Sequence, residues 1–194
     1  MVGGLSLARR GVDMLRAGGV GPVIVVTGAA GAGDLGTGPV LRAPAVSTSP
    51  GPGRGDVRTV HNPDWAEGMG SSLRAGLAAV PADCAAAVLA LADQPLVGPE
   101  AVRRLIRAYA DGAAVAVATY AGQPRNPVLI SRVYWPQVCE LAVGDVGARP
   151  FLRAHPELVT PVACDDTGQP DDVDTPADLD RVRALITGDS GADG

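Results

Sequence analysis

Apolar residues along this chain occur either in short continuous runs or at helical spacing. Continuous apolar runs cover residues 23–27, 86–91 and 114–119, with shorter ones at 57–60, 128–130 and 158–162. Strands that are apolar on both faces are typical of a sheet covered by helices on both sides. The runs therefore predict a buried, mainly parallel sheet.

Segments with apolar residues at helical spacing separate these runs and predict helices. The predicted helices cover residues 5–17, 71–79, 132–141 and 146–155, a segment that starts at 98–100, and a last one from 175. Ser71 or Ser72, Asp145 and Thr175 are the expected N-caps. In the last helix the expected buried stripe is Leu179, Val182, Leu185 and Ile186.

Strands that alternate with helices indicate an α/β fold. With 194 residues, the chain is long enough for one domain with a substantial core. We expect this domain to cover residues 1–187, followed by a disordered tail at 188–194. Ligands of such folds bind beyond the carboxyl ends of the strands.

Composition narrows the class of protein. The net charge is −5, and all 16 basic residues are arginine, which argues against a nucleic-acid surface. No apolar run approaches the roughly 20 residues of a membrane span. The three cysteines are widely spaced and form no CxxC pair, so neither a zinc site nor a disulfide framework is indicated. These features predict a cytoplasmic protein.

Asp93 directly follows the apolar run at 86–91 and precedes Pro95. A carboxylate there would lie at the ligand-binding edge and could hold Mg2+, which prefers oxygen ligands. Because Asp and Pro are also common turn residues, an ordinary turn explains the same pattern.

Three carboxylates, Asp171, Asp172 and Asp174, crowd the start of the last helix. Helix capping needs one acid rather than three. Crowded acids repel, so a bound cation or solvent must offset their charge. Asp93 and Asp174, with Asp172 as a further candidate, could meet at one divalent ion that bridges a triphosphate.

A glycine-rich segment precedes the predicted helix at 71–79. Its glycines allow close backbone approach to a ligand, and its N–H groups and hydroxyls could meet a base edge or an anion. An ordinary loop and cap is the alternative. The candidate nucleotide-binding residues are Gly68, Met69, Gly70, Ser71 and Ser72.

Weaker candidates for substrate binding are Asp145, Arg149, Arg125 and Asn126. Arg149 could face phosphate or acid groups, whereas Asp145 is also explained as a helix cap. Residues 31–36 match GxGxxG, but the segment that follows them cannot form the helix that a dinucleotide fingerprint requires.

Taken together, five motifs in order resemble the MobA-like nucleotidyltransferases, in particular the molybdenum cofactor cytidylyltransferases. The motifs are NPDWAEGMGSSL at 62–73, LADQPL at 91–96, RNPVL at 125–129, GDVGAR at 144–149 and DVDTPADL at 172–179. The resemblance implies a three-layer α/β/α, Rossmann-like fold. It implies transfer of a nucleotidyl group, CMP from CTP foremost, to a molybdopterin-type cofactor with release of pyrophosphate. Asp93 and Asp174 would bind Mg2+, and residues 68–72 would face the base and ribose.

One part of the family pattern is missing. Family members open with a strand and a loop of the form LAAGxSxRMGxxK, which wraps the triphosphate, and this sequence matches only after it. Two neighbouring strands would then lack a partner. We expect either an incomplete N-terminus on an enzyme, or an inactive homologue that binds molybdenum hydroxylases during their maturation. Guanylyl transfer to a small phosphorylated acid, or an unrelated Rossmann-type protein using residues 31–36, are further alternatives.

Overall fold

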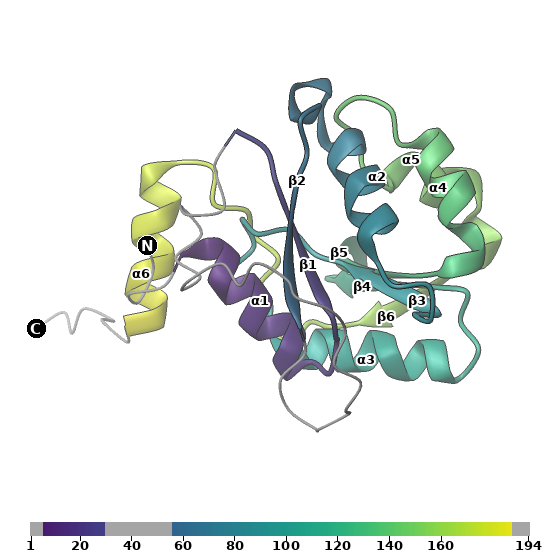
Figure 1. Ribbon diagram of the computed structural model, residues 1–194. Helices are drawn as coiled ribbons and strands as arrows, with labels where there is room; N and C mark the ends of the chain where they lie inside the picture. The colour runs from purple at the N-terminus through teal and green to yellow at the C-terminus, as the bar shows by residue number, and fades with distance from the viewer. Residues whose placement is uncertain (1–5, 30–55, 188–194) are drawn as a thin grey trace, which may run out of the picture.

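The structure, a computed structural model, describes residues 6–29 and 56–187 (Figure 1). Strands form at the predicted apolar runs: β1 (Val23–Thr27), β2 (Val57–His61), β3 (Ala86–Leu89), β4 (Val115–Tyr120), β5 (Gln123–Ser131) and β6 (Val159–Ala163). The main helices are α1 (Leu7–Ala17), α2 (Met69–Ala79), α3 (Pro99–Ala110), α4 (Trp135–Leu141), α5 (Arg149–Ala154) and α6 (Pro176–Thr187). The α/β class is confirmed. The GxGxxG segment and the predicted tail lie outside the described residues.

The strands form two sheets. β1 and β2 pair in parallel, and the other sheet has the order β3-β5-β4-β6. Within the described residues, β1 pairs only with β2 and β3 only with β5. Among these strands, only β4 and β5 are therefore paired on both sides.

β5 departs from the sequence-based expectation. It runs antiparallel to both β3 and β4 and is longer than the predicted run at 128–130. A two-residue turn, Ala121-Gly122, with positive φ at both positions, folds β5 back onto β4. Such turns match the twist of paired strands. Polar residues at the start of β5 hid this strand from the hydropathy pattern.

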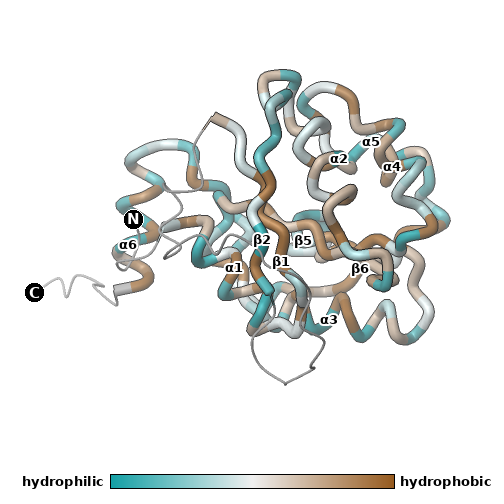
Figure 2. Tube along the Cα trace, in the orientation of Figure 1, coloured by the Kyte–Doolittle hydropathy of each residue, from teal (hydrophilic) through white to brown (hydrophobic). Residues whose placement is uncertain are grey.

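Helices cover both faces of the four-stranded sheet. In β4, Val115 and Val117 face a cluster with Leu77 of α2, Val138 of α4 and Phe151 of α5. The alternate residues of β4 face the opposite layer, where α3 and α1 lie. Side chains alternate across a strand, so an all-apolar strand needs cover on both sides. In Figure 2 the tube is brown along β1 and alternates between brown and teal along α3.

α2 and α1 also pack on β1, so the same two helix layers serve both sheets. This is the three-layer arrangement that the resemblance implied. None of the helices within the described ranges is long and apolar enough to cross a membrane.

Two predicted helix starts are wrong. α2 begins at Met69 with Gly68 as its N-cap, before Ser71 and Ser72. α5 begins at Arg149 with Ala148 as its N-cap, so Asp145 does not cap it. In both cases a side-chain cap was inferred from a local pattern, whereas contacts with distant residues position these segments.

The predicted cap of α6 is confirmed, and its predicted buried stripe is confirmed in part. Thr175 and Asp178 form reciprocal bonds: Asp178 N donates to Thr175 Oγ1 at 3.2 Å, and Thr175 N donates to Asp178 Oδ2 at 3.0 Å. Val182 is buried, but Leu185 is 55% exposed. α6 lies at the edge of the molecule (Figure 1) and buries less than a full helical face.

Candidate functional site

Two distant segments run antiparallel at the carboxyl edge of the four-stranded sheet. Val173 N donates to the carbonyl oxygen of Asp93 at 2.8 Å, and Gln169 N donates to that of Leu96 at 3.1 Å. An isolated bridge joins Val97 to Gly168. These main-chain bonds bring the LADQPL and DVDTPADL motifs together.

Two glycines allow the segments to approach so closely. A Cβ on Gly98 would lie 2.1 Å from the carbonyl oxygen of Thr167. Gly168 has φ +137°, and a Cβ there would lie 2.2 Å from the carbonyl oxygen of Leu96. Only glycine fits such backbone contacts without displacement. Neither glycine was recognised from sequence, because the contact is between segments.

Asp93 lies where a cation could be held. Its Oδ1 is buried and has no hydrogen-bond partner among the described residues. Burial raises the pKa of Asp93 above its ordinary value, and the carboxylates of Asp172 and Asp174 raise it further. The structure therefore brings together the three acids that the sequence singled out. No arginine in the described part of the chain pairs with any of them.

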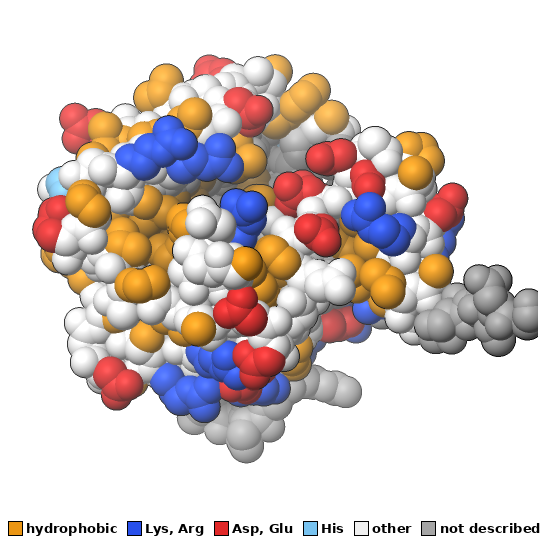
Figure 3. Space-filling model, turned by 180° about the vertical axis from the view of Figure 1, so that it is seen from behind, with side chains coloured by type: hydrophobic (Ala, Val, Ile, Leu, Met, Phe, Trp, Pro, Cys, Tyr) orange, Lys and Arg blue, Asp and Glu red, His pale blue; other side chains and the backbone are white. Residues whose placement is uncertain are grey.

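These residues suit a divalent ion that prefers oxygen ligands and takes only one or two of them from the protein. The described residues contain no group of three side chains arranged to hold a metal by themselves. Mg2+ usually takes one or two carboxylates and completes its shell with substrate phosphates and water. Asp93, with its unpartnered oxygen, and the exposed Asp174 can supply such a pair. Figure 3 shows acidic side chains gathered beside the lobe that contains α6.

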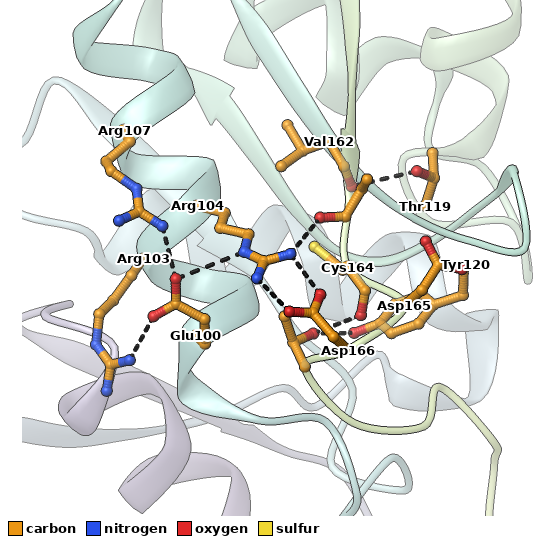
Figure 4. Close-up of polar contacts among 12 residues, drawn as sticks. Glu100, Arg103, Arg104, Arg107, Thr119, Tyr120, Val162, Cys164, Asp165 and Asp166 are labelled. Atoms are coloured by element: carbon orange, nitrogen blue, oxygen red, sulfur yellow. Dashed lines mark hydrogen bonds and ion pairs between the residues drawn. The ribbon is translucent and has the colours of Figure 1, made fainter.

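The start of the acidic segment is anchored to α3 (Figure 4). Arg104 donates to both carboxylate oxygens of Asp166 at 2.7 Å and to the carbonyl oxygen of Ala163 at 2.8 Å. The guanidinium lowers the pKa of Asp166 below its usual value. On α3, Glu100 accepts hydrogen bonds from Arg103 and Arg107. The anchor fixes where the segment leaves β6.

A second group of residues surrounds the N-terminus of α2. Met69 N donates to Asp145 Oδ1 at 3.3 Å, and Gly70 N donates to the carbonyl oxygen of Gly144 at 2.8 Å. A Cβ on Gly70 would lie 2.3 Å from the carbonyl oxygen of Ala142. The 142–145 loop thus caps α2, which joins two of the predicted motifs.

Asn62 organises the same region, a role that the sequence did not reveal. It is only 2% exposed. Its Nδ2 donates to Ser71 Oγ at 2.8 Å and Ser72 Oγ at 3.0 Å, and its Oδ1 accepts from Asp64 N at 3.0 Å. Ser71 and Ser72 therefore contact Asn62 in this structure. The signal was present in the NPD sequence at 62–64, which is typical of an Asx turn.

The weaker candidates divide between these two regions. Arg125 and Asn126 lie at the start of β5, and the β3–β5 register places them just beyond the carboxyl end of β3, on the side of Asp93. Arg149 is exposed at the start of α5, near the cap of α2.

Comparison with known proteins gives consistent matches. The sequence profile described as MobA-like NTP transferase domain matches residues 1–159. Nicotine blue oxidoreductase of Paenarthrobacter nicotinovorans is 38% identical over 132 residues. The match covers 64% of this chain and 64% of that relative, so it spans less than two thirds of the relative's length.

Solved structures show the same fold. Rv0371c from Mycobacterium tuberculosis H37Rv, in complex with manganese, has a TM-score of 0.71 and 27% identity, and the match covers 94% of this chain and 88% of that one. A nucleotidyl transferase from Methanothermobacter thermautotroptrophicus has a TM-score of 0.72 at 21% identity, over 98% of this chain and 84% of that one. The second match supports the fold alone.

Proposed function

The chain belongs to the MobA-like NTP transferase family, and from this premise we propose that it transfers CMP from CTP to a molybdopterin-type cofactor and releases pyrophosphate. The observation that carries the proposal is the juxtaposition of Asp93 with Asp172 and Asp174 at the carboxyl edge of the sheet. A manganese complex of a structure that is 27% identical supports a divalent ion in this class of protein.

In the proposed reaction, a phosphate oxygen of the acceptor attacks the α-phosphorus of CTP, and pyrophosphate leaves with the electrons of the broken P–O bond. Such an attack needs little acid–base help, so positioning and charge stabilisation carry the catalysis. A bound Mg2+ would neutralise the charge that develops on the phosphates. Asp93 and Asp174 would hold it.

The remaining candidates have supporting roles in the proposal. Residues 68–72 would contact the base and ribose of the nucleotide, with the α2 N-terminus held in place by Asn62 and Asp145. Arg125 and Asn126 would contact the acceptor, since they lie on the same side of the sheet as Asp93. Arg149 would interact with phosphate or carboxylate groups beside α2.

The test is pyrophosphate release by the full chain with Mg2+ and molybdopterin cofactor, with CTP and GTP compared. We expect Asp174→Asn to reduce turnover by at least 100-fold, since one metal ligand is lost. Asp83→Asn is the matched control, because Asp83 is an exposed acid in the loop before β3. Turnover that is equal in both variants would overturn the role of Asp174.

The nucleotide comparison separates the alternatives. Turnover with GTP and a small phosphorylated acid, but not with CTP and the pterin, would support guanylyl transfer. Failure to bind either nucleotide would overturn the transferase proposal and favour the inactive maturation partner, which should then co-purify with a molybdenum hydroxylase apoenzyme.

The resemblance to nicotine blue oxidoreductase favours one second function, a redox reaction, because that relative is 38% identical. In the described chain the three cysteines are free, and burial raises the pKa of the Cys139 and Cys164 thiols. Raised thiol pKa values disfavour thiol redox chemistry. Hydride transfer in the presence of a nicotinamide cofactor, unaffected by Asp174→Asn, would support the second function.

A further inference from the structure

Gln94 is a buried polar residue beside the acids that the motifs did not single out. The residue is only 7% exposed. Nε2 donates to Asp172 Oδ1 at 2.8 Å and to the carbonyl oxygen of Pro170 at 3.1 Å. Both hydrogens of the amide are therefore used, and both go to the acidic segment.

These bonds are the side-chain part of the contact between the two segments. The other bonds, at Asp93, Leu96 and Val97, are made by main-chain atoms and do not depend on residue type. On the side of the acids, the last main-chain hydrogen bond between the two segments is the one that Val173 N donates to Asp93. Between these main-chain bonds, Gln94 holds the carboxylate of Asp172 and the carbonyl group of Pro170.

The amide of Gln94 is packed on its other side. Gln94 borders, with Met14, Leu91, Val97 and Pro127, a mostly apolar gap that is too small to hold a water molecule. Asp172 is exposed, so without the amide its carboxylate would be free to turn outward to solvent. Loss of the amide should therefore displace the acidic segment.

The Gln94 amide is also uncharged, which matters for the binding of a cation. Asp93, Asp172 and Asp174 lie close enough for their negative charges to repel one another. An arginine at position 94 would carry a positive charge, which would compete with a bound cation. A glutamine holds the carboxylate in place and leaves the negative potential available for a metal ion.

We propose that Gln94 is a positioning residue of the metal site, which holds Pro170 and the carboxylate of Asp172 in place beside Asp93. This inference rests on the proposed function, because it assumes that these acids bind a divalent ion. Residues that orient metal ligands without touching the metal typically contribute 10- to 100-fold in metal affinity.

The test compares Gln94→Met with Thr167→Val in the full chain. Methionine has nearly the shape of glutamine but no donor. Thr167 is a matched control: it is also buried, and its hydroxyl donates to a main-chain oxygen, that of Cys164, in the same segment at 2.7 Å. Each variant removes buried hydrogen bonding, but only Gln94 bonds to an acid of the site.

Two measurements are made, thermal unfolding without metal and Mn2+ affinity by titration. We expect both variants to lower Tm, but only Gln94→Met to weaken Mn2+ binding, by about tenfold or more. Hydrogen exchange of residues 169–176 should also accelerate in Gln94→Met. If Gln94→Met unfolds, Gln94→Asn, which keeps an amide one methylene too short, should show the same loss of affinity.

The outcomes separate the two proposals. Wild-type protein that does not bind Mn2+ would overturn the metal site of the proposed function. If wild type binds Mn2+ and Gln94→Met changes its Mn2+ affinity by less than about twofold, the role of Gln94 alone would be overturned. The same conclusion would follow if Thr167→Val weakened Mn2+ binding as much as Gln94→Met.

Discussion

The N–H of Val173 donates to the carbonyl oxygen of Asp93 across 2.8 Å, although the two residues lie in motifs far apart in the sequence. Through this bond the acids that precede the last helix lie beside the acid that follows β3. The fold therefore creates a negatively charged site from residues that are unremarkable in isolation, and the stability of the fold should reflect the electrostatic cost.

Asp93→Asn should stabilise the metal-free protein at pH 7. The folded-state pKa of Asp93 is raised, so its ionisation opposes folding: stability is lost as the pH rises above the unfolded value of about 4 and through the folded value. Because the carboxyl is still partly solvated, we expect a gain of no more than about 1 kcal/mol, or roughly 2–4 °C in Tm.

Thermal unfolding of wild type and Asp93→Asn at pH 3.5 and pH 7 tests this prediction. The two proteins should unfold alike at the lower pH, and added Mn2+ should raise the Tm of wild type only. A variant less stable than wild type at pH 7 would contradict the electrostatic account.

Gly70→Ala should destabilise the protein. The new Cβ would lie 2.3 Å from the carbonyl oxygen of Ala142 and would push the 142–145 loop away from α2. Overpacking of this kind costs about 1–3 kcal/mol, measurable by urea denaturation.

Gly11→Ala in α1 provides the matched control. Gly11 also lies within a helix, but a Cβ there meets nothing within 4 Å. Alanine should therefore stabilise by about 0.5–1 kcal/mol through its helix propensity. Equal effects of the two substitutions would show that the loop contact does not constrain Gly70.

Asp166→Asn should destabilise the protein in a pH-dependent way. Arg104 lowers the pKa of Asp166, so the ion pair adds stability above the unfolded value of about 4 and loses it as the pH falls through the folded value. The variant should be less stable than wild type at pH 7 and equal to it at low pH. A difference independent of pH, measured by urea denaturation, would argue against the ion pair.

Asn62→Ala should destabilise α2 and weaken nucleotide binding together. It leaves the Ser71 and Ser72 hydroxyls and the Asp64 N–H without their shared partner, at a cost of about 1–3 kcal/mol. Ser72→Ala removes one of these bonds and should cost less. Urea denaturation and CTP titration check both, and a CTP affinity unchanged in Asn62→Ala would separate this cluster from the nucleotide.

What the sequence determined by itself is local. The apolar runs predicted the strands because a doubly covered sheet needs apolar residues on both faces. The Thr175–Asp178 cap was also predictable, since its two bonds join residues in one helical turn. Asp93, Asp172 and Asp174 were singled out because several acids beside predicted strand and helix ends need a partner.

The tertiary structure decided how these local features combine. Asp145 contacts Met69 instead of capping its own helix, because the loop that carries it packs on Gly68 and Gly70. Leu185 is exposed because α6 lies at the edge, where little of its apolar stripe finds a neighbour. Gln94 binds the acidic segment only because Gly98 and Gly168 let two chain segments meet, a long-range contact that no periodicity in the sequence encodes.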